Sequence, residues 1–298
     1  MKYRRVLKDR LARYYMLGIA VLSLLLILII GLSLLFKALP IMKEHSLGSL
    51  LSSSSWKPFK GEFGFLPFIL STLYVSLIAI ILALPAAMLT SIYLNSYASD
   101  RLRRFFEPVI DLLSGIPPVI YGVWGTLTVV PLISEKIAPH FVEFSAGYSV
   151  LAGGLVLAIM ILPLLISILL EVFRSMPEEI SDASLSLGAT KWQTVKKVML
   201  RRSIPGIIAA IVLAISRAFG ETIAVLMVCG NIPIVPKSIF EACYPLPALI
   251  ANNYGEMLSM PGYESALMLG ALLLFLIIVL FNGVSRITLN RIERRFQL

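Results

Sequence analysis

The sequence predicts an all-α polytopic membrane protein with six transmembrane helices. Hydrophobic residues make up 58% of the 298 residues and charged ones only 14%. Six apolar stretches reach the roughly 20 residues that a helix needs to cross the hydrocarbon layer. They are Tyr15 to Phe36, Phe65 to Leu94, Pro108 to Leu132, Gly147 to Leu170, Ile204 to Cys229 and Ser265 to Val284. We therefore expect tails at 1–14 and 285–298, a first helix with its outer loop at 15–64, and a transmembrane core at 65–284.

The basic residues predict which side each loop occupies. Six crossings put both termini on one side, and the tails and loops of that side hold 19 Lys and Arg against 6 on the other. Cytoplasmic loops carry this excess in membrane proteins, so both termini are predicted to be cytoplasmic. The formal charge of +9 is thus explained by the cytoplasmic membrane surface and its lipids, and it indicates no nucleic-acid partner.

The third predicted helix contains a double proline. Pro117 and Pro118 break the hydrogen-bond ladder, and backbone freed at membrane depth must face protein or a water-filled cavity. Gly115, Pro117, Pro118 and Tyr121 are therefore candidate gate or path-lining residues, with core packing at a kink as the alternative. Asp111, nearer the cytoplasm, is a candidate for the substrate path or else a partner for a basic loop.

The fifth predicted helix carries the one basic residue that is not in a loop or tail, Arg217. An arginine at mid-membrane needs a partner, a cavity or a ligand, and its planar fork of donors suits phosphate oxygens. Glu221 is expected one turn further along the same face, with Gly220 opening the helix surface between them. We predict that Arg217, Gly220 and Glu221 line a substrate path; a purely structural Arg217–Glu221 pair is the alternative.

A predicted 33-residue cytoplasmic loop, 171–203, carries strong signals for the starts and ends of helices. Ser175 and Glu178 predict a capping box, and Gly188 predicts the end of the helix. Thr190 with Gln193 predicts a second capped helix, Lys191 to Leu200. Physics alone allows an amphipathic hairpin lying on the headgroups.

The same loop resembles the cytoplasmic EAA loop of ABC-importer permeases. The similarity lies in Asp182-Ala183-Ser184, Leu185, Leu187-Gly188-Ala189 and Val198-Met199-Leu200, although Asp182 replaces the usual Glu. The resemblance implies the fold of a type I ABC importer permease, whose coupling helix docks into the ATP-binding subunit. The residues that would make this contact are Glu179, Asp182, Ala183, Leu185, Gly188 and Ala189.

Further motifs, in register from about residue 56 onward, are similar to the C-type permease of the phosphate-specific ABC importers. They are Trp56-Lys57-Pro58, Phe63-Gly64, Ser71-Thr72-Leu73, the stretch Gly115 to Gly125 and the stretch Ser216 to Thr222. This resemblance implies a phosphate import complex in a bacterial or archaeal plasma membrane. It also implies a second phosphate permease of the A type, two ATP-binding subunits that hold the ATP and Mg²⁺, and an extracytoplasmic phosphate-binding protein.

The sequence indicates no catalytic, cofactor or metal site in this chain itself. There is no Gly-x-x-x-x-Gly-Lys-[Ser/Thr] loop for ATP, and His45 and His140 lack neighbours at metal-ligand spacing. Cys229 and Cys243 are both expected on the outer side, where a disulfide could form. We favour two unpaired thiols, because two cysteines are no disulfide framework.

Three other functions remain open at this point. The chain could be a permease for another oxyanion, such as sulfate, molybdate or phosphonate. It could be a stand-alone secondary anion transporter or channel, for which inverted-topology repeats would be expected and none is seen. It could also be a membrane scaffold in which Arg217 and Glu221 only hold helices together.

Overall fold

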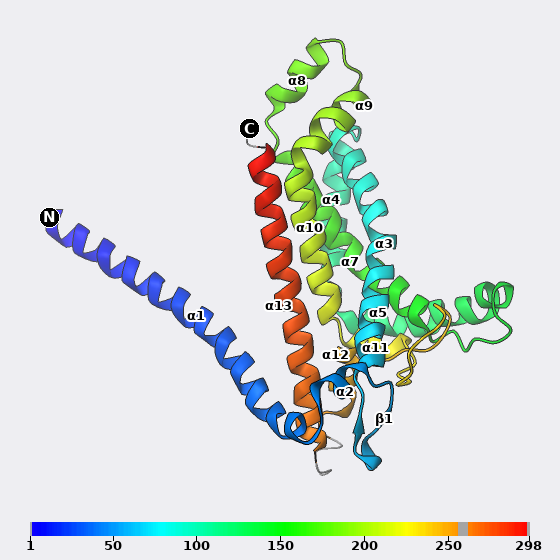
Figure 1. Cartoon of the computed structure of the whole chain (residues 1–298). Coiled ribbons are helices and arrows are strands. Elements are labelled where there is room, and N and C mark those ends of the chain that lie inside the picture. The colour runs from blue at the N-terminus through cyan, green and yellow to red at the C-terminus, as the bar shows by residue number, and fades with distance from the viewer. Residues whose placement is uncertain (1, 256–261, 297–298) are drawn as a thin grey trace.

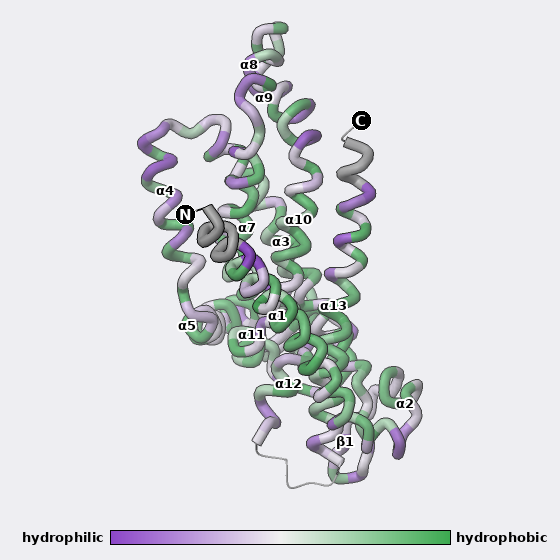
Figure 2. The backbone as a smooth tube through the Cα atoms, turned by 90° about the vertical axis from the view of Figure 1, so that its left-hand side faces the viewer, coloured by the Kyte–Doolittle hydropathy of each residue, from purple (hydrophilic) through white to green (hydrophobic). Residues whose placement is uncertain are grey.

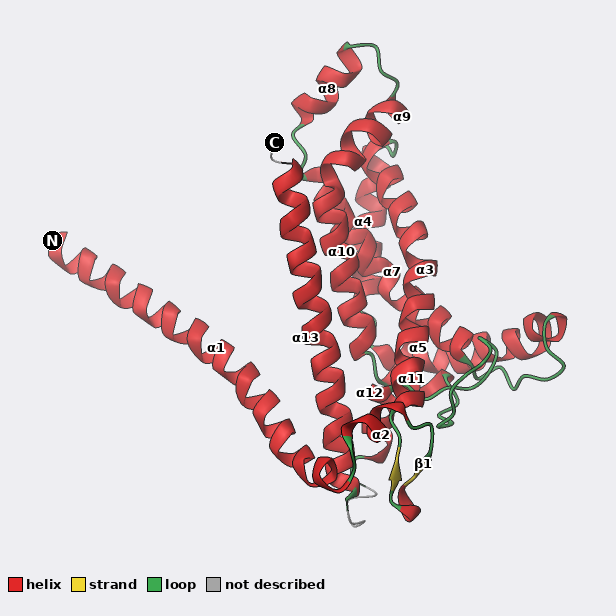
Figure 3. Ribbon diagram, in the orientation of Figure 1, coloured by secondary structure: helices red, strands yellow, loops and turns green. Residues whose placement is uncertain are grey.

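The computed structural model describes residues 2–255 and 262–296, and the chain is almost entirely helical within them (Figure 3). Residues 1 and 297–298 of the predicted tails, and 256–261 of the last outer loop, lie outside this description. Five described helices are long and apolar enough to cross a membrane, or six if a sharply bent pair counts as one span. The all-α polytopic architecture that the apolar stretches predict is confirmed.

The centre of the fold is a bundle of α3 (Leu66–Ser96), α7 (Val150–Arg174), α10 (Leu200–Gly220) and the first half of α13 (Tyr263–Phe296) (Figure 1). The contact between α3 and α7 is the most extensive. Glycines on α7 allow the two helices to approach closely. A Cβ added on Gly153 would lie 3.2 Å from the Val75 side chain, and one added on Gly154 would lie 2.4 Å from the Ile78 side chain. Small residues let membrane helices approach in this way, so α3 and α7 form the rigid core of the molecule.

The first helix, α1 (Lys2–Glu44), leans away from this bundle and contacts it only near the C-terminal end of α1 (Figure 1). Gly31 packs against Phe275 of α13, and Lys37 Nζ donates to Glu264 at 3.0 Å. None of its apolar window is buried, and Figure 2 shows that window as continuously hydrophobic. The predicted first transmembrane helix is therefore present, and its apolar surface is left uncovered by the rest of the described chain.

An aromatic cluster closes the end of the bundle opposite α8. It gathers α2 (Leu47–Ser52), the antiparallel strands β1 (Trp56–Lys57) and β2 (Glu62–Phe63), a 3-10 turn between them (Pro58–Lys60), and α12 (Leu246–Asn253). Trp56 packs edge-on against Phe63, Phe65 and Phe68, with ring centroids 4.8 to 5.5 Å apart. Such edge-to-face pairs are favourable beyond their buried area, so the predicted outer loop is an ordered cap.

The third predicted span, Pro108 to Leu132, is not one helix. The structure has α4 (Asp100–Ser114), then α5 (Pro118–Trp124), a π-helical turn (Gly125–Val129), α6 (Val130–Leu132), a second π-helical turn (Ile133–Ile137) and a 3-10 turn (Ala138–His140). The two halves meet at 89°. Pro117 and Pro118 were expected to interrupt hydrogen bonding, but the change of direction is far larger than a kink.

The cytoplasmic loop also differs from the prediction in part. α8 (Glu178–Ser186) is a separate helix, but α9 (Lys191–Thr194) continues through a π-helical turn (Val195–Met199) into α10. The predicted second surface helix is therefore the beginning of the fifth span. The fifth span in turn stops at Gly220 and resumes as α11 (Ile223–Val228), so the predicted single helix from Ile204 to Cys229 is wrong.

Candidate functional site

The candidate site lies where two broken helices meet, and the first break is the bend between α4 and α5. Gly115 ends α4, Pro117 precedes α5 and Pro118 is its first residue, where proline is favoured. Tyr121, one turn into α5, donates its hydroxyl to the carbonyl of Leu113 at 2.9 Å. The tyrosine thus bridges the bend, and all four predicted gate residues belong to this one feature.

The second break separates α10 from α11 and was not predicted. The helix ends at Gly220, and Glu221 has extended backbone angles (φ −70°, ψ 126°). The Glu221 carboxylate accepts a hydrogen bond from the backbone N–H of Ala224 at 3.2 Å. A carboxylate at a helix start satisfies a free donor and complements the helix dipole, so this side chain starts α11.

This geometry contradicts the predicted Arg217–Glu221 pair. The pair requires one continuous helix that presents positions four apart on one face, and the chain leaves the helix between the two residues. Among the side chains that the structure describes, the ion pairs are Lys37 with Glu264 and Arg174 with Glu107. Glu221 caps a helix, and none of the described carboxylates forms an ion pair with Arg217.

The two breaks pack side by side because glycines on the bent span let α11 approach. A Cβ on Gly122 would lie 2.6 Å from the sulfur of Met227 and 3.2 Å from the Cα of Ala224. One turn further along this span, the Thr126 hydroxyl donates to the carbonyl of Met227 at 3.2 Å. The second half of each broken helix is therefore held against the other.

Arg217 lies in the last turn of α10, next to these breaks, with an exposed side chain. A positive charge in a last turn interacts favourably with the helix dipole. Gly220 follows on a surface where an added Cβ would meet nothing within 4 Å. Arg217 and Gly220 thus face open space at the break that leads into α11, and α11 packs on the helix that carries Tyr121.

Asp111 does not join this group. It lines a separate cavity of about 180 Å³ between α4 and the end of α7, together with Glu107, Glu171 and Arg174. Arg174 forms an ion pair with Glu107 there. This position agrees with the alternative in which Asp111 neighbours a basic residue of the cytoplasmic loop.

The helix α8 projects from the end of the molecule and has no buried residue (Figure 1). The predicted capping box at its start is wrong, because Pro177 occupies the N-cap and the Ser175 hydroxyl donates to the carbonyl of Val172 instead. Its end is as predicted: Gly188 has φ +84°, and its N–H donates to Leu185 O at 2.9 Å. Only glycine adopts that angle without strain.

The predicted coupling residues lie on or directly after this helix. Glu179, Asp182, Ala183, Leu185 and Gly188 are exposed, and Ala189 is half-buried. The second capping box is confirmed, because the side chains of Thr190 and Gln193 each accept a hydrogen bond from the backbone N–H of the other residue. Leu187 is 90% exposed, so the turn after α8 presents an apolar side chain that this chain leaves uncovered.

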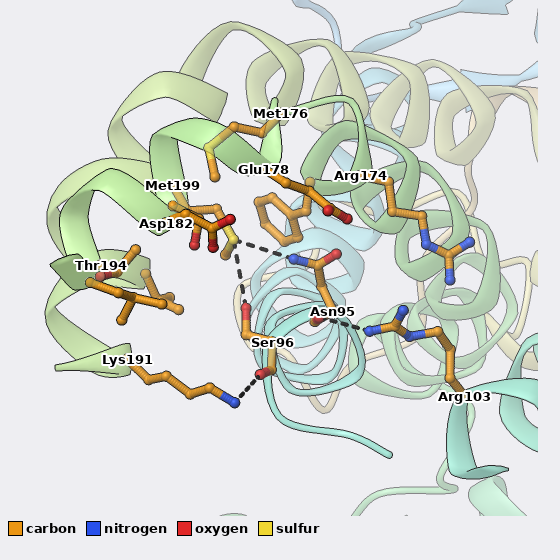
Figure 4. A pocket seen from close by; sticks show the side chains of 14 residues that line it. Asn95, Ser96, Arg103, Arg174, Met176, Glu178, Asp182, Lys191, Thr194 and Met199 are labelled. Atoms are coloured by element: carbon orange, nitrogen blue, oxygen red, sulfur yellow. Dashed lines mark hydrogen bonds between the residues drawn. The ribbon is translucent and has the colours of Figure 1, made fainter. Parts of the chain in front are cut away.

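Beneath α8 lies a cavity of about 670 Å³ (Figure 4). Lys191 Nζ donates to the carbonyl of Ser96 at 3.5 Å and lies over the Tyr97 ring, and Ser184 shares a hydrogen bond with Thr194. These contacts tie α8 to α9, and α9 to the C-terminal end of α3. The sequence analysis did not find these contacts, because they join residues about 95 positions apart or lie between two helices of the loop, and neither kind of contact has a local sequence pattern.

Comparisons with known proteins agree with this geometry. Residues 83–297 match the family described as binding-protein-dependent transport system inner membrane component. The chain is 35% identical over 261 residues to the phosphate transport system permease protein PstC of Pasteurella multocida, covering 83% of this chain and 81% of that protein. It is 32% identical over 289 residues to the probable phosphate transport system permease protein PstC of Methanocaldococcus jannaschii, covering 92% and 91%.

A solved structure shows the same fold. The MetNI methionine ABC transporter, in inward-facing conformations, aligns with a TM-score of 0.55 and 17% identity over 74% of this chain and 91% of that chain. This likeness supports the type I importer permease fold that the sequence motifs predict.

Proposed function

The chain belongs to the family of binding-protein-dependent transport system inner membrane components, and we propose that it is one of the transmembrane permeases of an ATP-driven phosphate importer. Relatives that match most of the chain include phosphate transport permeases. In this role it is a permease and not an ATPase, and hydrolysis takes place in partner subunits.

The observation that carries the proposal is the arginine beside the two helix breaks. Arg217 has no ion pair or hydrogen bond to any described residue, and its side chain is exposed. An unpaired guanidinium at membrane depth requires a compensating group, and a phosphate anion matches its charge and its planar donors. Irregular backbone at this depth is tolerated where it lines a cavity, which supports a path past Arg217, Gly220 and Tyr121.

The partners follow from the same proposal. An extracytoplasmic phosphate-binding protein delivers the anion at the end capped by the Trp56 cluster, and a second permease, of the A type, completes the path. Two ATP-binding subunits, with their ATP and Mg²⁺, dock on α8. Leu187 and Leu185, 90% and 38% exposed, offer the apolar contact, while Glu179 and Asp182 offer charge. Both termini are then cytoplasmic, in a bacterial or archaeal plasma membrane.

The test is phosphate uptake into proteoliposomes that contain this chain with its second permease, the ATP-binding subunits and the binding protein. We expect uptake that requires ATP and the binding protein and that excess sulfate or molybdate does not inhibit. Uptake of phosphate by this chain alone, without ATP, would show a secondary transporter instead. Preferential uptake of another oxyanion would retain the permease assignment and overturn the substrate.

Docking on α8 has its own test. Gly188→Leu forces a side chain into φ +84°, and Leu185→Asp places a charge on the apolar contact. We expect both variants to insert normally but to lose ATPase co-purification and uptake. Lys57→Ala, in the turn at the opposite end, is the matched control. Normal ATPase association in both α8 variants, together with normal uptake, would overturn the assignment of this helix.

A further inference from the structure

Cys229 and Cys243 are fourteen positions apart in the sequence and become direct neighbours in the fold. Cys229 ends α11, and Cys243 lies in the segment that returns towards α12. The N–H of Cys243 donates to the carbonyl of Cys229 at 2.9 Å, and the N–H of Asn231 donates to the carbonyl of Cys243 at 3.1 Å. Gly230 and Cys243 thereby form a parallel bridge.

The hydrogen bond from the N–H of Cys243 to the carbonyl of Cys229 places the two residues on adjacent, paired segments. Paired extended segments run about 4.8 Å apart, and the Cα atoms of disulfide-linked residues lie about 4.4–6.8 Å apart, so this pairing is compatible with a disulfide. The two side chains are free thiols in the structure. Both are fully buried.

The surrounding chain is shaped to keep the two segments close. Gly230 has φ +84°, and a Cβ there would lie 3.0 Å from the Cβ of Ala242. Gly153 of α7 leaves room for the sulfur of Cys229, since a Cβ on Gly153 would come within 2.4 Å of it. No group of three or more His, Cys, Asp or Glu side chains gathers here or elsewhere in the described residues, so a metal is not what the pair serves.

We propose that Cys229 and Cys243 are oxidised to an intramolecular disulfide on the extracytoplasmic side. The two S–H bonds break and one S–S bond forms, while the two protons and two electrons pass to the disulfide of an extracytoplasmic thiol–disulfide exchange protein, which leaves as a dithiol. Exchange needs access to a thiolate, so the reaction takes place during folding, before α7 covers Cys229. The inference rests on the outward placement of this end proposed above.

The bond ties the end of α11 to the loop that leads into α12. The α11 helix begins at Ile223, two residues after Glu221, and packs against the bent span through Gly122. A disulfide at its far end therefore fixes the outer half of the broken fifth span, while its inner half, α10, continues from the cytoplasmic loop. Movement of α8 is then transmitted to the break and not dissipated by loosening of the outer segment.

The test is a thiol count on the full complex in its native membrane. Acid-quenched membranes are denatured with N-ethylmaleimide, reduced, and then treated with a polyethylene-glycol maleimide. We expect the chain to gain two labels only after reduction, and the unreduced linked peptides to have a mass lower by two hydrogens than the dithiol. Cys229→Ser and Cys243→Ser are the controls, and each should expose one thiol without reduction. Two thiols alkylated before reduction in the wild-type chain would overturn the proposal.

A second arm separates this inference from the topology on which it rests. Ser54 is exposed in the predicted outer loop, and Ser54→Cys in the Cys229→Ser, Cys243→Ser background should react in intact cells with a membrane-impermeant maleimide. Labelling of this variant together with free wild-type thiols would overturn the disulfide and leave the transport proposal standing. No labelling of Ser54→Cys would overturn both the orientation and the disulfide.

Discussion

The two helix breaks at the site both interrupt a predicted transmembrane helix, but different residues cause them. The bend between α4 and α5 depends on backbone chemistry, because Pro117 and Pro118 cannot donate the hydrogen bonds of a continuous helix. The break between α10 and α11 contains no proline. It depends on a side chain, the Glu221 carboxylate, which satisfies the N–H of Ala224 at the start of the new helix.

This difference separates what is fixed from what can change. A proline break persists in every conformation, and here the Tyr121 hydroxyl secures it further. A side-chain cap costs about 0.5–2 kcal/mol to remove, which is small enough for a conformational change to reverse. We therefore expect the bent span to stay fixed during transport and the break beside Arg217 to be the one that can straighten.

The largest expected effect is at Arg217, the charge between the two breaks. Arg217→Gln removes a charge-assisted interaction worth about 1.5–3 kcal/mol, so uptake of phosphate should fall roughly 10- to 100-fold. Arg217→Lys should lie between, because charge remains and the planar fork is lost. Arg202→Gln, exposed at the cytoplasmic end of the same helix, is the control in the proteoliposome assay. Full activity of Arg217→Gln at wild-type protein levels would exclude Arg217 from the path.

The contact that joins the breaks gives the next effect. Gly122→Leu pushes a side chain into Met227 and Ala224, and overpacking of this kind costs about 1–3 kcal/mol. We expect a lower melting temperature in detergent together with lower uptake. Gly283→Leu, at a helical glycine with open space around its Cβ position, is the matched control. Equal melting temperatures for the two variants would show that α5 and α11 do not depend on this contact.

The cap at Glu221 should show a smaller effect that depends on hydrogen bonding more than on charge. Glu221→Ala leaves the N–H of Ala224 without its acceptor and should cost about 0.5–2 kcal/mol. Glu221→Gln keeps an acceptor oxygen and should recover most of that loss, which melting temperature in detergent measures. If Gln is as damaging as Ala, the carboxylate charge acts on something other than the cap.

The sequence was most informative where the signal is local to the backbone. Prolines at 117 and 118 predicted an interruption, Gly188 predicted a helix end, and four of the apolar stretches predicted the long helices α1, α3, α7 and α13, because each signal depends on a property of the residues themselves. The family motifs around Gly115 to Gly125 and Ser216 to Thr222 predicted a resemblance that the matching relatives confirm.

The sequence was least informative where a side chain had two possible partners. Glu221 is four residues from Arg217, and this spacing favours an ion pair as long as the helix continues. Nothing in the local sequence says that the carboxylate instead accepts from Ala224 and ends that continuity. The proximity of the two cysteines could not be predicted from the sequence either. It results from a backbone bridge between Gly230 and Cys243, which joins the end of α11 to a later segment of the chain.

The smallest expected effect is at Tyr121, where the fixed break is secured. Tyr121→Phe keeps the buried ring but removes the hydrogen bond to Leu113 O, worth about 0.5–1.5 kcal/mol. The low end applies, because the same carbonyl also accepts from Ile116 N–H at 3.3 Å and so keeps a partner. We expect a small drop in melting temperature and nearly normal uptake. Tyr93→Phe, 51% exposed on α3, is the control. A large loss of uptake in Tyr121→Phe without a loss of stability would mean that the hydroxyl contacts the anion beside Arg217, and the bend would then be part of the path's chemistry as well as its wall.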